Sequence, residues 1–563
     1  MIFKVLLCAL FILFYRINRR LSRRYLILFI LIISITFSVP GEAHGGPELG
    51  CCIRTIEFVW RLPDDISEKL SDIFDSSSIL IVDTEAETVF EKSGLSKGSW
   101  GSDCIAVAGN KVVMGPSGGY FSLGGNSILI VDTDTNKVTK KGGLSKARWG
   151  YNSTVTAGNK VVMGHDGYRS WYDNSILIVD TARGRVTEKV VPSPAKWGKE
   201  SIAVVGNKVV MGPGDKDSSI LIVDTEKGRV TEKQDISYAE WGYGSMAVVG
   251  NKVVMGRRDE GTSILIVDTD TETVIEKDGF SEACWGLFST VVSGNKVVMG
   301  RSGTSILIVD TDTGSVIEKK GLSDAAWGYG SMAVVGNKVV MGRRDEGASI
   351  LIVDTDTETV TEKKGLSKAH WGSFSTVVVG NKVVMGSGNT SILIVDTIKG
   401  TVVEKRGLSD AEWGWHSTVV AGNKVVMGSH NTSILIVDTK KGTVSEKRGF
   451  SKALWGYGSI AVVGNKVVMG RADSGTSILI VDTDKETVTE KDGLSEAYWG
   501  LFSTVAAGDK VVMGSGFDRS RGTSILIVDA TKGTVTEKGG FYEAVWGYNS
   551  MAVVGNKVVI GQE

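Results

Sequence analysis

One phrase, SILIVD or a near match to it, recurs along the chain and constrains its fold more than any other feature. Eleven copies follow one another between residues 78 and 561, at spacings of 42 to 49 residues. They end at Asp83, Asp132, Asp180, Asp224, Asp268, Asp310, Asp354, Asp396, Asp438, Asp482 and Asp529. A repeat of about 44 residues is typical of solenoids, propellers and linear arrays. Residues 241–261 recur without change at 327–347, two units later, so the units are near copies.

Each unit predicts four short strands, and residues 375–405 show the pattern. The expected strands are 375–380, 382–386, 391–396 and 401–405, with a Gly-Asn turn between the first two. The second and third are continuous apolar runs, which indicates burial on both faces. The fourth mixes Val with Thr, Glu and Lys, as an outer edge strand does. The unit therefore predicts one four-stranded blade of a β-propeller, an all-β fold.

The two ends of the array predict how it closes. The first unit begins at its third strand, at Ser78, and the last ends after its second strand, near Gly561. The two halves would complete one split blade, so we expect one closed ring of eleven blades. Eleven exceeds the usual four to eight blades, which leaves two smaller propellers as the alternative and an open solenoid as a third arrangement.

The unit resembles the YVTN-type β-propeller repeats of secreted and surface-layer proteins. The similarity lies in the third and fourth strands, as in SILIVDTKKGTVSEK at 433–447, and in the preceding strand pair, and it extends over residues 78–561. This chain has VVMG where that family usually has a YVAN-like stretch, and VVGN where it often has a longer turn. The resemblance implies a propeller in an extracytoplasmic setting. It implies little about the ligand, because propellers host many functions.

The first 77 residues differ from the repeats. Residues 2–15 and 25–39 are apolar, and the segment between them carries five arginines. This pattern predicts that residues 1–43 are a signal peptide, cleaved after Ala43, or a membrane anchor, with the main body secreted or held at the cell surface. Residues 44–77, with Cys51 and Cys52, form a junction, and residues 78–563 form the β-propeller repeat domain.

Composition excludes several classes of protein. The chain has 63 Lys and Arg against 64 Asp and Glu, a net charge of −1, and so lacks the basic surface of a nucleic-acid-binding protein. Apolar residues at 42% and charged residues at 23% argue against disorder. Five cysteines in 563 residues are too few for a disulfide scaffold.

One short segment, x-A-x-W-G-x-x-S, varies between otherwise similar units. The residue before each Trp, and those two and three after it, differ in size, charge and polarity. A core position would not tolerate that range, so we expect these side chains to point into solvent near the mouth of the central channel. Varied loops on one face of a rigid scaffold are typical of a recognition surface, although unrestrained drift would also vary them. The candidate ligand-binding residues are Arg148, Tyr151, Lys196, Glu240, Tyr243, His370, Phe374, Glu412, Trp415, His416, Tyr498 and Phe502. The recurrent Trp itself is predicted to be a structural wedge between blades.

Signals for catalysis and metal binding are weak. None of the five histidines lies in a metal-binding spacing, and no nucleophile elbow, P-loop or dinucleotide fingerprint occurs. Asp-x-Asp pairs such as Asp268 and Asp270 favour a capped turn over a calcium loop, which needs six or more oxygens. We therefore predict no catalytic residue, metal or cofactor.

Together these features predict an exported, non-enzymatic propeller that binds a protein or glycan at a cell surface through its varied loops. The membrane would be contacted only by the N-terminal segment, and nucleic acid not at all. One alternative is a structural surface-layer or adhesive spacer. Another is a lyase- or hydrolase-like enzyme with a site in the channel, built from unrepeated residues such as His370, His416 and Glu412.

Overall fold

The computed structural model describes residues 77–95, 99–117, 125–166, 174–516, 523–541 and 544–562. These residues form forty-three strands, and no helix is found among them. The strands form ten antiparallel sheets, nine of four strands and one of seven. In the seven-stranded sheet, β22 (Val316–Val335) is both the outer strand of one blade and the inner strand of the next, so the sheets make eleven four-stranded blades.

We number the blades along the chain and give each from its inner to its outer strand. Blades 1 to 4 are β3 (Ser99–Ala108), β4 (Lys111–Ser117), β5 (Ile128–Asp132), β6 (Lys137–Lys141); β7 (Arg148–Ala157), β8 (Lys160–Asp166), β9 (Ser175–Asp180), β10 (Arg185–Val190); β11 (Trp197–Val205), β12 (Lys208–Pro213), β13 (Ile220–Asp224), β14 (Arg229–Lys233); and β15 (Trp241–Val249), β16 (Lys252–Arg257), β17 (Ile264–Asp268), β18 (Thr273–Lys277). Blades 5 and 6 share β22 and contain β19 (Thr290–Ser293), β20 (Lys296–Met299), β21 (Ser302–Asp310); and β23 (Lys338–Arg343), β24 (Gly347–Asp354), β25 (Thr359–Ala369).

Blades 7 to 10 follow the same order. They are β26 (Thr376–Val379), β27 (Lys382–Met385), β28 (Ile392–Asp396), β29 (Thr401–Lys405); β30 (Thr418–Ala421), β31 (Lys424–Met427), β32 (Ser433–Asp438), β33 (Thr443–Arg448); β34 (Trp455–Val463), β35 (Lys466–Arg471), β36 (Ile478–Asp482), β37 (Thr487–Lys491); and β38 (Thr504–Ala507), β39 (Lys510–Met513), β40 (Ser524–Asp529), β41 (Thr534–Gly539). Blade 11 takes its strands from both ends of the array, in the order β42 (Trp546–Val554), β43 (Lys557–Gln562), β1 (Ser77–Asp83), β2 (Thr88–Leu95).

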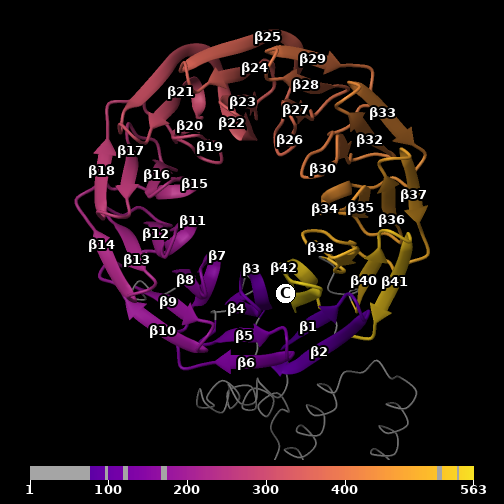
Figure 1. Ribbon diagram of the computed structural model, residues 1–563, viewed down its shortest axis with the longest axis horizontal. Coiled ribbons are helices and arrows are strands. Elements are labelled where there is room, and N and C mark those ends of the chain that lie inside the picture. Colours follow the sequence, from indigo (N-terminus) through magenta and orange to yellow (C-terminus); the bar gives the residue numbers. More distant parts are fainter. Residues whose placement is uncertain are drawn as a thin grey trace, which may run out of the picture. The chain divides into compact units, whose positions relative to one another are not determined.

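The eleven blades follow one another around a single closed ring (Figure 1). β1 pairs with β43, with Leu80 opposite Ile560, and β3 of blade 1 packs against β42 of blade 11. The predicted propeller with a split closing blade is confirmed. The two alternatives, a pair of smaller propellers and an open solenoid, are not what the chain forms.

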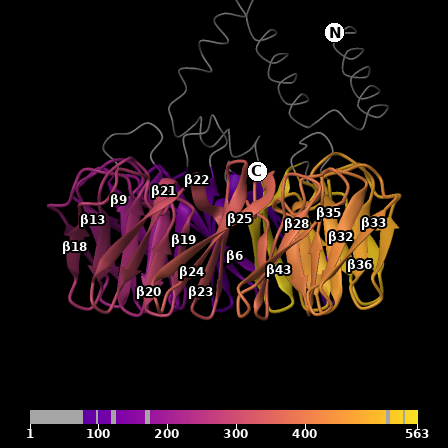
Figure 2. The ribbon, with the colours of Figure 1, turned by 90° about the horizontal axis from the view of Figure 1, so that it is seen from above.

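The ring has two faces, and the strand ends divide between them (Figure 2). On the loop face, each outer strand continues into the next blade past the recurrent Trp, and the second and third strands are joined. On the turn face, two tight turns join the first strand to the second and the third to the fourth.

Burial of the inner strands on both sides holds neighbouring blades together. Between blades 4 and 5, Val254, Ile264 and Ile266 of one blade pack against Val297 and Leu307 of the next. All five side chains are buried, and each contributes about 1.5–3 kcal/mol relative to exposure. The continuous apolar runs in the sequence therefore act as predicted, because each strand supplies alternate residues to the two junctions beside it.

The recurrent Trp is the wedge at every junction, as predicted. All eleven Trp side chains are fully buried, and the indole N–H of Trp285 donates to the carbonyl of Ser281 at 3.1 Å. Its own carbonyl lies against the Gly that ends the VVMG phrase of the preceding blade. An ideal Cβ on Gly256 would be 1.8 Å from that oxygen, so only glycine fits there.

Several predictions fall on other parts of the chain. The signal peptide or anchor at 1–43 and nearly all of the junction at 44–77, with Cys51 and Cys52, lie outside the described residues. Within the described residues, no helix has the length and apolar character needed to cross a membrane.

Candidate functional site

The varied segment at the loop face has a fixed backbone. The residue three after each Trp adopts a left-handed φ, between 44° and 59°, in all eleven blades. These residues are Asp103, Asn152, Glu200, Gly244, Phe288, Gly330, Phe374, His416, Gly458, Phe502 and Asn549. From blade 5 to blade 11 each also donates its backbone N–H to the carbonyl of its counterpart in the preceding blade, as Phe288 does to Gly244 at 2.7 Å. These contacts use backbone groups alone, so they form whether the residue is Gly, Phe, His or Asn.

From blade 4 to blade 11, an aromatic side chain follows each recurrent Trp by two or three residues and contacts the ring of a neighbouring blade, and we call these side chains the aromatic belt. The belt consists of Tyr243, Phe288, Tyr329, Phe374, His416, Tyr457, Phe502 and Tyr548. Consecutive ring centroids are 4.3 to 6.3 Å apart, mostly edge to face, and the shortest distance is the stack of His416 on Phe374. Such pairs contribute about 0.5–1.5 kcal/mol beyond burial.

Glycines make room for the belt in alternate blades. An ideal Cβ on Gly330 would be 2.8 Å from the ring of Phe374, and Gly244 and Gly458 have the same relation to Phe288 and Phe502. Sequence reasoning did not select Phe288, Tyr329, Tyr457 or Tyr548 as site residues. The alternation of Gly and Phe at one position in successive units was the signal that could have identified them.

In blades 2 to 4, charged side chains pack on the aromatic rings of the loop face. The Arg148 guanidinium and the Lys199 ammonium lie 5.7 and 5.9 Å from the ring centre of Tyr151, within cation–π range. In blade 4, Arg258 lies 4.4 Å above the Tyr243 ring and 3.4 Å from the carboxylate of Glu240. Burial, assisted by the carboxylate of Glu200, raises the pKa of Tyr243.

A pocket of about 260 Å³ opens between blades 7 and 8, and it gathers four of the predicted residues, His370, Phe374, Glu412 and Trp415. The rest of the lining is Arg344, Ser373, Ser375, Ser387, Gly388 and Trp413. Phe374 and Trp415 present aromatic surface, and Trp415 is 36% exposed. The polar groups around them include an arginine, an imidazole, a carboxylate and three hydroxyls.

Hydrogen bonds hold the polar wall of this pocket in place. Glu412 pairs with His430 at 3.1 Å, and the His430 ring lies 5.7 Å from Trp415. The Nδ1 atom of His370 contacts the carbonyl oxygen of Arg344. Burial lowers the pKa of His416, which stacks on the pocket residue Phe374, so the neutral imidazole is favoured at neutral pH. The arrangement offers flat apolar faces bordered by donors and acceptors, which suits binding of a small polar ring.

The other predicted residues are spread around the loop face. Arg148 and Tyr151 lie in blade 2, Lys196 in blade 3, Glu240 and Tyr243 in blade 4, and Tyr498 and Phe502 at blade 10. The expectation that all twelve side chains point into solvent holds for only three of them. His370, Glu412 and Trp415 are exposed, and the other nine are half-buried because they pack on their neighbours along the rim.

No cluster of three or more His, Cys, Asp or Glu that could hold a metal ion occurs in the described part of the chain. The Asp-x-Asp pairs serve the turns. Asp268 accepts the backbone N–H groups of Asp270 and Thr271 at 2.9 and 3.1 Å, and the Asn251 amide bridges both carboxylates at 3.1 Å. The interpretation of these pairs as turn caps is confirmed.

Comparisons with known proteins give only low similarity. No protein-family model and no curated protein matches this sequence, so the YVTN-type resemblance stands only at the level of a four-stranded propeller repeat. Among solved structures, the chain is similar to the computationally designed Ika8 protein, with 20% identity over 61% of this chain and 96% of that one, and a TM-score of 0.34. It is also similar to apo AztD from Citrobacter koseri, with 12% identity over 57% and 92% and a TM-score of 0.32. BamB from Moraxella catarrhalis has 12% identity over 64% and 96%, with a TM-score of 0.33. These similarities are too low to carry a functional inference.

Proposed function

We propose that this chain is an exported, non-enzymatic β-propeller that binds a glycan or protein partner at a cell surface through its loop face. The observation that carries the proposal is the pocket between blades 7 and 8. It forms in the one blade that has Trp and His, at 415 and 416, two and three residues after the recurrent Trp. Export is supported by the apolar N-terminal segments and by the resemblance to repeats of secreted proteins.

The size and chemistry of the pocket favour one ring-shaped polar unit of the partner. About 260 Å³ is slightly below the range of about 300–1,000 Å³ typical of small-molecule sites, so one sugar-sized ring suits it better than a longer ligand. The faces of Trp415 and Phe374 can stack on the apolar side of such a ring. Arg344, His370 and Glu412 can then bond its hydroxyls or a carboxylate.

The chain supplies its own fold-preserving variant for the test. Glu412→Ala, Trp415→Tyr and His416→Gly together convert the loop of blade 8, AEWGWHS, into that of blade 6, AAWGYGS. The matched control is Glu240→Ala, which makes the loop of blade 4 identical to that of blade 6, far from the pocket. Native protein and both variants would be applied to a glycan array and to intact cell surfaces.

We expect the native chain and the control to bind and the triple variant to lose at least tenfold in affinity, with unchanged circular dichroism. Equal binding by all three would show that the pocket is not the site. Absence of binding by the native chain would favour the structural spacer. Conversion of a bound glycan would favour the enzyme, with His370, His416 and Glu412 as the first residues to replace.

A further inference from the structure

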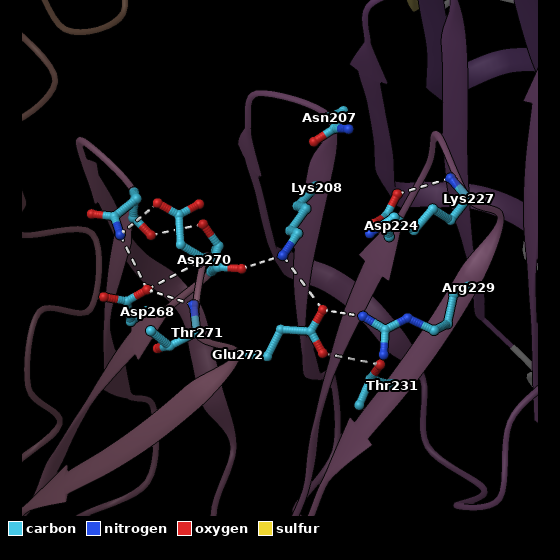
Figure 3. A network of polar contacts seen from close by, with 12 residues as sticks. Asn207, Lys208, Asp224, Lys227, Arg229, Thr231, Asp268, Asp270, Thr271 and Glu272 are labelled. Carbon is cyan, nitrogen blue, oxygen red and sulfur yellow. Dashed lines mark hydrogen bonds and ion pairs between the residues drawn. The ribbon is translucent and has the colours of Figure 1, made fainter.

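On the turn face, a carboxylate of one blade is held by a cage on the blade before it (Figure 3). Glu272, in the last turn of blade 4, reaches back to blade 3. Its carboxylate lies 3.4 Å from the Lys208 ammonium and 3.4 Å from the Thr231 hydroxyl, and it pairs with the guanidinium of Arg229. Lys208 also donates to the carbonyl of Thr269.

The position equivalent to Glu272, in the turn between the third and fourth strands, makes the same kind of contact around the ring. Wherever its residue has a side-chain oxygen, that oxygen contacts the lysine that begins the second strand of the preceding blade. The pairs are Glu87 with Lys510, Asn136 with Lys557, Glu272 with Lys208, Glu358 with Lys296 and Glu486 with Lys424. At the other six junctions the position is glycine, which has no side chain to reach the lysine.

One of the six glycine junctions keeps the whole cage and lacks only the carboxylate. Blade 2 has Lys160, Arg185 and Thr187 where blade 3 has the three cage residues, because the outer strands of both blades read RVTEK. Gly228 of blade 3 stands where blade 4 has Glu272, with a similar φ of 64° against 54°. The remaining nine blades have no arginine at the first position of this outer strand, so the cage is complete only in blades 2 and 3.

A pocket of about 320 Å³ opens at this junction, lined by Lys160, Arg185, Thr187 and Gly228. Lys160 keeps the bond to a turn carbonyl, that of Thr225, as Lys208 does to Thr269. The backbone of Arg185 lies opposite Asp180 in the sheet, but its guanidinium makes no hydrogen bond or ion pair with any described residue. The whole lining carries five cationic side chains against two carboxylates, a formal charge of +3.

We propose that the cage of Lys160, Arg185 and Thr187 binds an Asp or Glu side chain of a partner protein, at a site separate from the loop-face pocket. Glu272 shows which group the cage accepts, since the chain places its own glutamate carboxylate on the same three residue types. Arginine matches a carboxylate through paired N–H donors, and the surplus positive charge attracts an acidic segment. The pocket is larger than a carboxylate, which leaves room for the partner residues on either side of the bound Asp or Glu.

The test uses a fluorescein-labelled hexaglutamate peptide as the probe, followed by fluorescence polarisation at low and high salt. Gly228→Glu supplies the missing carboxylate from within the chain. Gly228→Ala is the matched control, because an ideal Cβ there has no heavy atom within 4 Å and the cage stays empty. Hexaglutamine serves as the uncharged peptide, and oligogalacturonate as a source of carboxylates without peptide.

We expect hexaglutamate to bind the native chain and the alanine variant alike, and the glutamate variant at least tenfold more weakly. Glu272→Gly should open a second cage and raise the number of peptides bound. Loss of affinity at high salt should accompany binding. The proposal is overturned if Gly228→Glu binds hexaglutamate as tightly as the native chain, if hexaglutamine binds equally well, or if oligogalacturonate binds better than the peptide. The loop-face triple variant should leave this binding unchanged.

Discussion

Replacing Gly386 with alanine should weaken the junction between blades 7 and 8 more than replacing a glycine of a tight turn. An ideal Cβ on Gly386 would lie 1.9 Å from the carbonyl oxygen of Trp413, whereas real Cβ atoms essentially never come within 3.0 Å of another heavy atom. The two blades would therefore have to separate by roughly 1 Å at a close-packed contact. Overpacking costs about 1–3 kcal/mol, and occasionally more, and a backbone carbonyl cannot rotate away. We expect about 3 kcal/mol.

Gly380→Ala, in the same blade, separates this effect from the ordinary cost of losing a glycine. Gly380 has a φ of 59° and no heavy atom within 4 Å of an ideal Cβ. Alanine there should therefore cost only about 1–2 kcal/mol, which a non-glycine residue needs to adopt a left-handed backbone. Urea unfolding followed by tryptophan fluorescence measures both, because Trp413 is buried at the altered contact. The Gly386 variant should be less stable by at least about 1 kcal/mol. If the two variants unfold at the same urea concentration, the close contact between blades does not determine stability, and the wedge role of Trp is refuted.

Three further predictions concern the rim, acid stability and closure of the ring. Gly330→Ala should destabilise the chain by about 1–2 kcal/mol through its left-handed backbone and its 2.8 Å approach to Phe374, and Phe374→Ala should cancel part of that loss in a double-mutant cycle of urea melts. Burial would raise the pKa of Glu404, but Arg406 and Ser367 hold it down to about 2. The stability that this carboxylate contributes is complete above its unfolded pKa of about 4.3 and is lost as pH falls toward 2, so the melting temperature should drop in that window and drop less in Glu404→Gln. Removal of residues 557–562, which form β43, should leave β1 unpaired, and size-exclusion chromatography should show an expanded or associated species; an unchanged elution volume would contradict closure through this strand.

The sequence of a single repeat predicted the strands of a blade well, because a strand buried on both faces is a continuous run of apolar residues. In blade 7 the expected strand at 391–396 is β28 (Ile392–Asp396), and the expected strand at 382–386 is β27 (Lys382–Met385). Ring closure was also predictable, since the first repeat lacks its first two strands and the last repeat lacks its last two, and together they complete one blade. Both are properties of one repeat or of the order of repeats.

The start of the inner strand depends on a neighbour, and the sequence did not reveal it. β15 begins at Trp241, several residues before the apolar run, and its pairing with β16 shifts register between Trp241 and Met246. Gly244 lies within this shift with a left-handed φ of 57°, and its carbonyl accepts the N–H of Phe288, 44 residues away in the next blade. The aromatic belt was missed for the same reason, because the rings that contact one another belong to successive repeats. A variable position looks unconstrained when each unit is read alone, and its packing becomes visible only when adjacent units are set side by side.

The split blade has a consequence for how the chain is made. Ser78 and Gln562 are hydrogen-bonded in the finished blade although 484 residues separate them. At about 5–20 residues per second, β1 waits roughly half a minute to a minute and a half for β43 to be synthesised. Until then its edge can accept the same strand from another molecule, because all copies carry identical closing strands. Crowded synthesis should therefore produce domain-swapped rings in which each molecule completes the last blade of its neighbour, and their proportion should rise with the density of ribosomes on the message.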